Sequence, residues 1–183
     1  MEQELFDVLS ELEMQAGADI VPYQAAKMAS ILAVSNKARV IVEVGSGVGY
    51  TTLWLAYAAS LSGGQVITCE LDPAKVETTR VNLDRAGMAG YVEILPGDAR
   101  DTLRQRDEAV DFLFLDGDNS QYETYFDVVY KQMGVGGVVV ANGVVSDEDE
   151  LADYTTYVQN HPNLESVTVP VGAGLEVSVK ISE

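Results

Sequence analysis

The chain has few basic residues, a single cysteine, and no long apolar run. Its 183 residues include 11 Lys and Arg against 29 Asp and Glu, which gives a net charge of −18. Nucleic acids and anionic membranes both attract Lys and Arg, so this charge argues against either as a partner. The one cysteine, Cys69, leaves no disulfide within the chain and no thiolate metal cluster. It falls in the apolar segment 65–70, where we expect a small buried residue.

Targeting and membrane signals are also missing from the sequence. No segment approaches the roughly 20 apolar residues of a membrane span. The start, Met1-Glu-Gln-Glu-Leu5, has neither the basic nor the apolar region of a secretory signal. We therefore expect a cytoplasmic protein. A hydrophobic content of 47% and a charged content of 22% are typical of a soluble globular protein, and the length predicts one domain over residues 1–183.

Strand and helix patterns alternate along most of the chain. Two helices are expected first, at 2–15 and 22–34. Strands are then expected at 39–44, 66–70, 91–95, 111–115 and 136–141, and helices at 50–60, 73–87, 99–106, 121–132 and 147–160. This order predicts an α/β fold whose mostly parallel central sheet has helices on both faces. Two further strands, 166–171 and 175–181, predict an antiparallel hairpin at the C-terminus.

The most informative segment is a strand followed by a glycine turn and a helix. Val40–Val44 is a short apolar run, Gly45, Gly47 and Gly49 follow it, and a helix is expected from Tyr50. Glycines let a backbone approach a ligand, and a helix N-terminus favours negative groups. A dinucleotide site needs its third glycine at position 50, where this chain has Tyr50. The turn therefore suits a nucleoside that carries an amino acid better than a pyrophosphate.

Polar side chains follow most of the expected parallel strands, at the sheet edge where such folds bind ligands. Asp72 and Asp98 are explained as helix N-caps, and Ser120 with Glu123 as a capping box. Glu70 has no such structural explanation. It lies 21 residues after Gly49, where a carboxylate can accept hydrogen bonds from both hydroxyls of a ribose.

Taken together, these motifs resemble a known enzyme family. They are Glu43-Val-Gly-Ser-Gly-Val-Gly-Tyr-Thr-Thr52, Glu70-Leu-Asp-Pro73, Gly97-Asp-Ala99, Asp111-Phe-Leu-Phe-Leu-Asp-Gly-Asp118, Tyr122 and Gly174-Leu-Glu-Val-Ser-Val-Lys180. From about Val21 onward the chain is similar to S-adenosylmethionine-dependent O-methyltransferases of the catechol and caffeoyl-CoA type. The resemblance implies a Rossmann-like methyltransferase fold, with residues 1–36 forming helices that cover the site.

The resemblance also implies a set of cofactor contacts. These are Glu43, Gly45, Ser46, Gly47, Gly49, Tyr50, Thr51, Glu70, Leu71, Asp98, Ala99 and Asp116. In this scheme Glu43 holds the methionine amino group, Glu70 the ribose, and Asp98 with Ala99 the adenine. Asp116 lies near the sulfonium and, in relatives, also binds a divalent metal.

Two positions depart from the metal-dependent members of that family. Those relatives have Asp-Asn where this chain has Ala141 and Asn142, and a lysine where it has Asn119. The first change removes a metal carboxylate and the second removes a candidate base. We therefore expect no tightly bound divalent metal, with Asp116 and Asn142 as the remaining candidate ligands. Asp116 and Asp118 are then the candidate catalytic residues, as base or as orienting group.

The predicted function is S-adenosylmethionine-dependent methylation of a hydroxyl on a small-molecule acceptor. Two alternatives stay open: a non-catalytic or regulatory S-adenosylmethionine-binding protein of the same fold, and a nicotinamide-dependent oxidoreductase, against which Tyr50 counts. Base rates for oligomers favour a homodimer. The sequence does not identify the acceptor.

Overall fold

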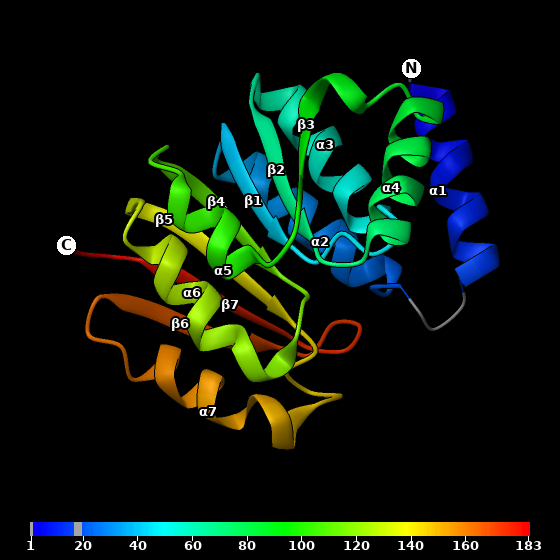
Figure 1. Ribbon diagram of the computed structural model, residues 1–183. Helices are drawn as coiled ribbons and strands as arrows, with labels where there is room; N and C mark the ends of the chain where they lie inside the picture. Colours follow the sequence, from blue (N-terminus) through cyan, green and yellow to red (C-terminus); the bar gives the residue numbers. More distant parts are fainter. Residues whose placement is uncertain (1, 17–19) are drawn as a thin grey trace.

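A computed structural model describes residues 2–16 and 20–183 as a single sheet between two layers of helices (Figure 1). The strands are β1 (Val40–Val44), β2 (Gln65–Glu70), β3 (Val92–Pro96), β4 (Val110–Leu115), β5 (Met133–Asn142), β6 (Leu164–Val169) and β7 (Leu175–Lys180). Their order in the sheet is β3-β2-β1-β4-β5-β7-β6. β1 to β5 run parallel, while β7 is antiparallel to both β5 and β6. The predicted fold class and its C-terminal hairpin are confirmed.

The strand order places a crevice beside β1. From β1 the chain moves outward to β2 and β3, and it then returns to build β4 and β5 on the other side. Connections therefore leave β1 and β4 in opposite directions, and the carboxyl ends of these two neighbours are left uncovered between them. In open α/β sheets this is where ligands bind.

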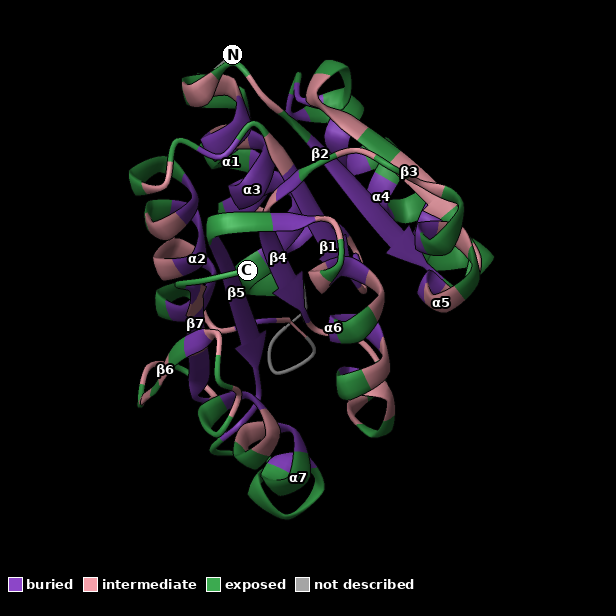
Figure 2. Ribbon diagram, turned by 90° about the vertical axis from the view of Figure 1, so that its left-hand side faces the viewer, coloured by how far each residue is buried: buried purple, intermediate pink, exposed green. Residues whose placement is uncertain are grey.

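Helices cover the two faces separately. One layer holds α2 (Tyr23–Ser35), α3 (Tyr50–Ser62) and α4 (Pro73–Arg85), with α1 (Glu2–Ala16) packed on α3 and α4. The other layer holds α5 (Ala99–Thr102), α6 (Tyr122–Tyr130) and α7 (Glu148–Gln159). Short 3-10 turns lie at Ala89–Tyr91, Leu103–Gln105 and Asn119–Gln121. Figure 2 shows buried strands between helices whose outer sides are exposed.

The two cores follow from the continuous apolar run of β4. Successive side chains of a strand point to opposite faces. Phe112 and Phe114 therefore belong to the core beneath α2 and α3, whereas Leu113 and Leu115 belong to the core beneath α6 and α7. Residues 112–115 are buried on both faces and are therefore all apolar, whereas Asp111 at the start of the strand accepts hydrogen bonds from the backbone N–H groups of Arg39 and Val40.

Several predicted boundaries are wrong by a few residues. The helix expected at 121–132 ends at Tyr130, and the one expected at 99–106 ends at Thr102 before a 3-10 turn. The capping box at Ser120 is also wrong. Asp118 instead caps the 3-10 turn Asn119–Gln121. Its Oδ1 accepts hydrogen bonds from the backbone N–H of Ser120 at 3.0 Å and from the Ser120 Oγ at 2.7 Å. β5 begins at Met133, earlier than predicted. Its first five residues include three glycines, which are uncommon in strands and so weaken the sequence pattern of a strand.

None of the helices in the described ranges is long and apolar enough to cross a membrane.

Candidate active site

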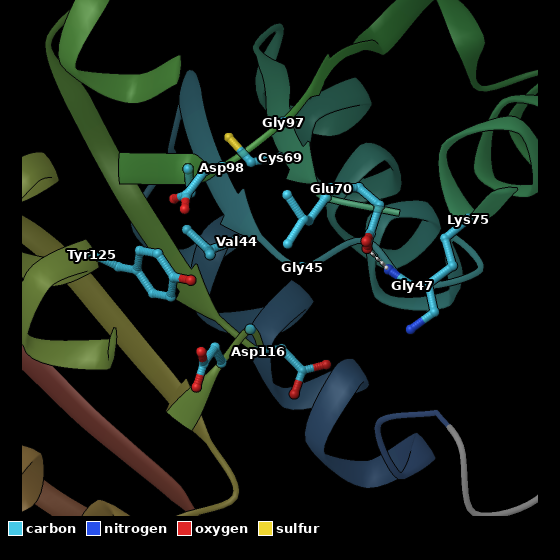
Figure 3. Close-up of a pocket in the computed structure, with 14 residues that line it drawn as sticks. Val44, Gly45, Gly47, Cys69, Glu70, Lys75, Gly97, Asp98, Asp116 and Tyr125 are labelled. Atoms are coloured by element: carbon cyan, nitrogen blue, oxygen red, sulfur yellow. Dashed lines mark hydrogen bonds between the residues drawn. The ribbon is translucent and has the colours of Figure 1, made fainter. Parts of the chain in front are cut away.

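A pocket of about 350 Å³ opens at the carboxyl ends of the central strands (Figure 3). Its volume falls in the range of small-molecule sites. The predicted site residues that line it are Gly45, Gly47, Glu70, Leu71, Asp98, Ala99, Asp116 and Asp118. They come from the segments that follow β1, β2, β3 and β4, so the fold gathers them as the strand-end pattern predicted. The lining includes no described residue of α1 or α2, and the covering role expected for residues 1–36 stays a prediction.

The first two glycines of the turn after β1 have different roles. Gly45 has a φ of +91°, and a Cβ added there would collide with the backbone carbonyl of Asp116. A residue without a side chain is therefore needed for the loops after β1 and β4 to touch. Gly47 has a φ of +53°, and an added Cβ would meet nothing within 4 Å. Gly47 itself lines the pocket.

Glu70 connects the glycine turn to the start of α4. Its Oε2 accepts a hydrogen bond from the Gly47 backbone N–H, and its Oε1 accepts one from the Asp72 backbone N–H, both at 2.9 Å. These bonds fix the carboxylate at the edge of the pocket. A carboxylate has about four acceptor positions, so Glu70 keeps capacity for a ligand with two neighbouring hydroxyls.

Asp98 is held by its helix and by an arginine. It caps α5, as predicted, by accepting a hydrogen bond from the Arg100 backbone N–H at 2.8 Å. The Arg100 guanidinium also pairs with the Asp98 carboxylate at 2.5 Å. These bonds lower the pKa of Asp98, so its carboxylate stays ionised as a hydrogen-bond acceptor.

Asp116 is the most perturbed carboxyl group in the pocket. Burial raises its pKa to about 6, a hydrogen bond from Asn142 Nδ2 at 2.8 Å opposes the rise, and the charge of Asp147 adds to it. The nearby charge of Lys75 lowers the pKa. A carboxylate of this kind can exchange a proton near neutral pH, which is what a general base requires.

The candidate metal ligands do not fit a tight divalent site. Asn142 turns its amide nitrogen, rather than its oxygen, toward Asp116, and Ala141 has no side-chain oxygen. No cluster of three His, Cys, Asp or Glu residues within residues 2–16 and 20–183 is arranged to hold a metal ion. Magnesium and calcium need about six oxygen ligands, usually with carboxylates among them.

The remaining predicted contacts are not among the residues that line the pocket. These are Glu43, Ser46, Gly49, Tyr50 and Thr51. The Glu43 side chain is fully buried, and its Oε2 accepts hydrogen bonds from the hydroxyls of Thr52 and Thr68, both at 2.6 Å. The Tyr50 hydroxyl donates to Glu13 at 2.5 Å. Their direct contact with a cofactor stays a prediction.

Six lining residues were not among the predicted site residues: Val44, Cys69, Lys75, Gly97, Gly117 and Tyr125. Tyr125 lies on Gly117, where an added Cβ would be 3.3 Å from its ring. It follows Tyr122 by three residues on α6, and this helical spacing was the available signal. Lys75 is the third residue of α4, on the helix that follows Glu70. Cys69 also lines the pocket, but burial raises the pKa of its thiol to about 11, which keeps it protonated.

Glu43 should make stability depend on pH. Burial raises the pKa of Glu43 from 4.5 to about 8, so the folded state binds this proton more tightly than the unfolded chain does. Each rise in pH between these values therefore lowers the free energy of unfolding. The melting temperature of wild type should therefore fall between pH 5.5 and pH 8. In Glu43→Gln, which has no proton to lose there, we expect this fall to be about 3–6 °C smaller. Exposed Glu148→Gln is the matched control and should leave the fall unchanged. Parallel curves for wild type and Glu43→Gln would contradict the assignment.

Comparisons with known proteins agree with this geometry. The profile of the O-methyltransferase family matches residues 3–181. The chain is 34% identical to a catechol O-methyltransferase of Niastella koreensis over 81% of this chain and 67% of that protein. A catechol O-methyltransferase of Mycobacterium tuberculosis is 32% identical over 81% of this chain and 73% of its own length.

A solved structure gives the same result. The O-methyltransferase from Bacillus cereus in complex with SAH matches with a TM-score of 0.84 and 27% identity, over 98% of this chain and 91% of that one. With the family profile covering nearly all of the chain, and with the sheet order and pocket described above, this chain belongs to the O-methyltransferase family.

Proposed function

We propose that this protein binds S-adenosylmethionine in the pocket beside β1 and methylates a hydroxyl oxygen of a small-molecule acceptor. The observation that carries the proposal is the Glu70 carboxylate, fixed beside the open glycine turn at Gly47. A carboxylate in that place suits the two hydroxyls of a ribose. The Bacillus cereus relative was solved with SAH, the product of the same cofactor, which supports the choice of ligand.

Each lining residue then has a definite task. Glu70 accepts hydrogen bonds from the ribose, and Asp98, kept ionised by Arg100, accepts one from the adenine amino group. When bound, S-adenosylmethionine supplies a sulfonium methyl group, which the acceptor oxygen takes by in-line displacement. The protein's main contribution is to hold donor and acceptor in line. The Asp116 carboxylate stabilises the positive charge of the sulfonium and accepts the proton that the acceptor hydroxyl loses. Asp118 orients the acceptor.

The acceptor we propose is small, uncharged or cationic, and phenolic. The two relatives named catechol O-methyltransferase support a catechol-like compound. Four carboxylates line the pocket, Glu70, Asp98, Asp116 and Asp118, and the chain carries a net charge of −18. These charges disfavour an acceptor with phosphates, such as a coenzyme A thioester. We further propose a single cytoplasmic domain that acts without nucleic-acid or membrane partners, and assembly as a homodimer.

Thermal unfolding with three ligands tests the cofactor, and transfer of a labelled methyl group to catechol tests the activity. S-adenosylmethionine and SAH should raise the melting temperature, because ligands of the folded state stabilise it by mass action, while NAD should not. Stabilisation by NAD alone would favour an oxidoreductase. Stabilisation by SAH without methylation of any phenol in a panel would favour a non-catalytic binder.

Methyl transfer should not require an added divalent metal. Asp116 and Asn142 offer one carboxylate and one amide, and that amide already donates to Asp116. We expect activity after treatment with EDTA to stay within about twofold of the untreated rate, because water would have to supply most of the coordination. Adding magnesium, manganese or calcium should then change little. A strict, saturable requirement at micromolar metal would contradict this prediction, and Asp118→Asn would be the next variant to measure.

A further inference from the structure

The C-terminal hairpin has polar side chains buried on one of its faces. α7 packs against β6 and β7, which lie at one end of the sheet (Figure 1). On the side that faces α7, β7 places Glu176, Ser178 and Lys180, and all three are buried. The Glu176 carboxylate accepts hydrogen bonds from Thr168 Oγ1 at 2.6 Å and from Gln159 Nε2 at 3.0 Å. These bonds fix which face of the hairpin lies under α7.

The opposite face of the hairpin is apolar and is only partly covered by the described helices. Val167 and Val169 of β6 and Val177 and Val179 of β7 point to this face, because successive side chains of a strand alternate. Val167 lies beside Val177 in register and is 58% exposed, and the other three valines are partly exposed. Ile181, two residues after Val179, is 47% exposed. We call these four valines and Ile181 the hairpin patch.

α2 borders the hairpin patch and extends its apolar surface. The turn between β6 and β7 touches the start of α2, since a Cβ added at Gly172 would lie 2.9 Å from the Ala25 side chain. Two turns further along the helix Ile31 is exposed. Residues 20–42, which include all of α2, contain no Asp or Glu, although the chain has 29 acidic residues. The surface beside the hairpin patch therefore carries little negative charge.

The burial pattern of the hairpin indicates that a partner covers this face. A sheet face that stays in water normally carries polar side chains, with the apolar ones turned toward the core. Here the polar side chains of β7 are buried under α7, and valines occupy the open face. A shift of the register by one residue would reverse this arrangement, but the hydrogen bonds of Glu176 hold it. Contiguous exposed apolar surface of this kind marks an interaction site.

A second copy of the chain is the partner that the charges favour. The net charge of −18 repels nucleic acids and anionic membranes, and it also makes two copies repel each other overall. The copies repel least where acidic residues are missing, which is along α2 beside the hairpin patch. The surface also carries charges of both signs, at Lys37 just after α2 and at Glu165 on β6. It is therefore complementary to its own copy, as a two-fold interface requires.

We propose that the hairpin patch, together with the outer side of α2, forms the interface of a two-fold homodimer. This inference rests on the homodimer proposed above and names its contact surface, and it does not depend on the ligand assigned to the pocket. The residues of the hairpin patch do not line the pocket, so an interface there leaves the pocket lining free.

Sedimentation velocity with three glutamate variants tests the proposal. Wild type should sediment as a dimer at micromolar concentration. Val167→Glu and Ile181→Glu each place like charges on both copies at the interface, so each should weaken self-association about 100-fold or more and give monomers. Val81→Glu adds the same charge on α4, away from the hairpin patch, at a position that is 47% exposed like Ile181. This control should remain a dimer.

Circular dichroism and SAH binding show whether each variant is folded. Both interface variants should keep the wild-type spectrum and bind SAH within twofold of wild type, because neither position lines the pocket. A dimer that survives both substitutions would overturn the inference, as would an equal loss of the dimer in Val81→Glu. A monomeric wild type would overturn the homodimer and its interface together, including one that binds neutral lipid vesicles through this face. Failure of a dimeric wild type to bind SAH would instead contradict the proposed function and leave the interface standing.

Discussion

Gly47→Val should abolish SAH binding, with an affinity at least about 100-fold below that of wild type, while the domain stays folded. Gly47 lines the pocket and an added Cβ there would meet no atom within 4 Å, so we expect a valine side chain to obstruct the ligand without its Cβ striking the protein. The backbone there has a φ of +53°, a conformation that costs a β-branched residue about 1–2 kcal/mol. We therefore expect the melting temperature to fall by about 3–8 °C.

Gly63→Val is a matched control for that strain. Gly63 follows α3, has a φ of +67° and likewise meets nothing within 4 Å of an added Cβ, but it does not line the pocket. The two valine variants should lose similar stability, and only Gly47→Val should lose binding, as titration calorimetry can show. Unaltered SAH affinity in Gly47→Val would refute the placement of the ligand over this turn.

Glu70→Ala should weaken SAH binding about 100-fold or more. The carboxylate is expected to accept hydrogen bonds from both ribose hydroxyls, and each bond to a charged group is worth about 1.5–3 kcal/mol. The variant also releases the backbone N–H groups of Gly47 and Asp72, which loosens the turn and adds to the loss. Melting-temperature shifts and calorimetry with SAH measure the effect.

Two comparisons separate ribose binding from other roles of Glu70. SAH and 5′-methylthioadenosine, which has the same nucleoside without the amino acid, both contain the ribose, so Glu70→Ala should weaken the binding of both to a similar degree. Glu70→Gln keeps one acceptor oxygen and should lose less affinity than Glu70→Ala. SAH binding to Glu70→Ala as tight as to wild type would show that the assignment of β2 is wrong.

The sequence was sufficient for the parts of the fold and site that depend on local patterns. The glycine turn after Val40–Val44 and the polar residues after β2, β3 and β4 are adjacent in sequence to the strands that position them. Because the carboxyl ends of parallel strands meet at one sheet edge, knowing the strands was enough to gather Glu70, Asp98 and Asp116 in one pocket. The loss of a tight metal site, which Ala141 indicates, and the loss of a candidate base at Asn119 stay predictions.

Other features depend on orientation, which local patterns did not determine. β1 is buried on both faces, so no alternation of polar and apolar residues shows which way Glu43 points. Its direction follows from pairing with β2, where Thr68 lies beside it in register. Lys75 and Tyr125 reach the pocket because of how α4 and α6 pack on the sheet. The capping role of Asp118 was missed because Ser120 with Glu123 also fits a helix start.

The crystal structure of this protein with SAH is the most direct test of the account. We expect SAH to lie across the carboxyl ends of β1 and β2, with its ribose hydroxyls on Glu70 and its adenine beside Asp98. Its sulfur should lie toward Asp116. A complex in which SAH binds elsewhere, or in which the ribose has no contact with Glu70, would contradict the central claim that this pocket is the methyl-donor site.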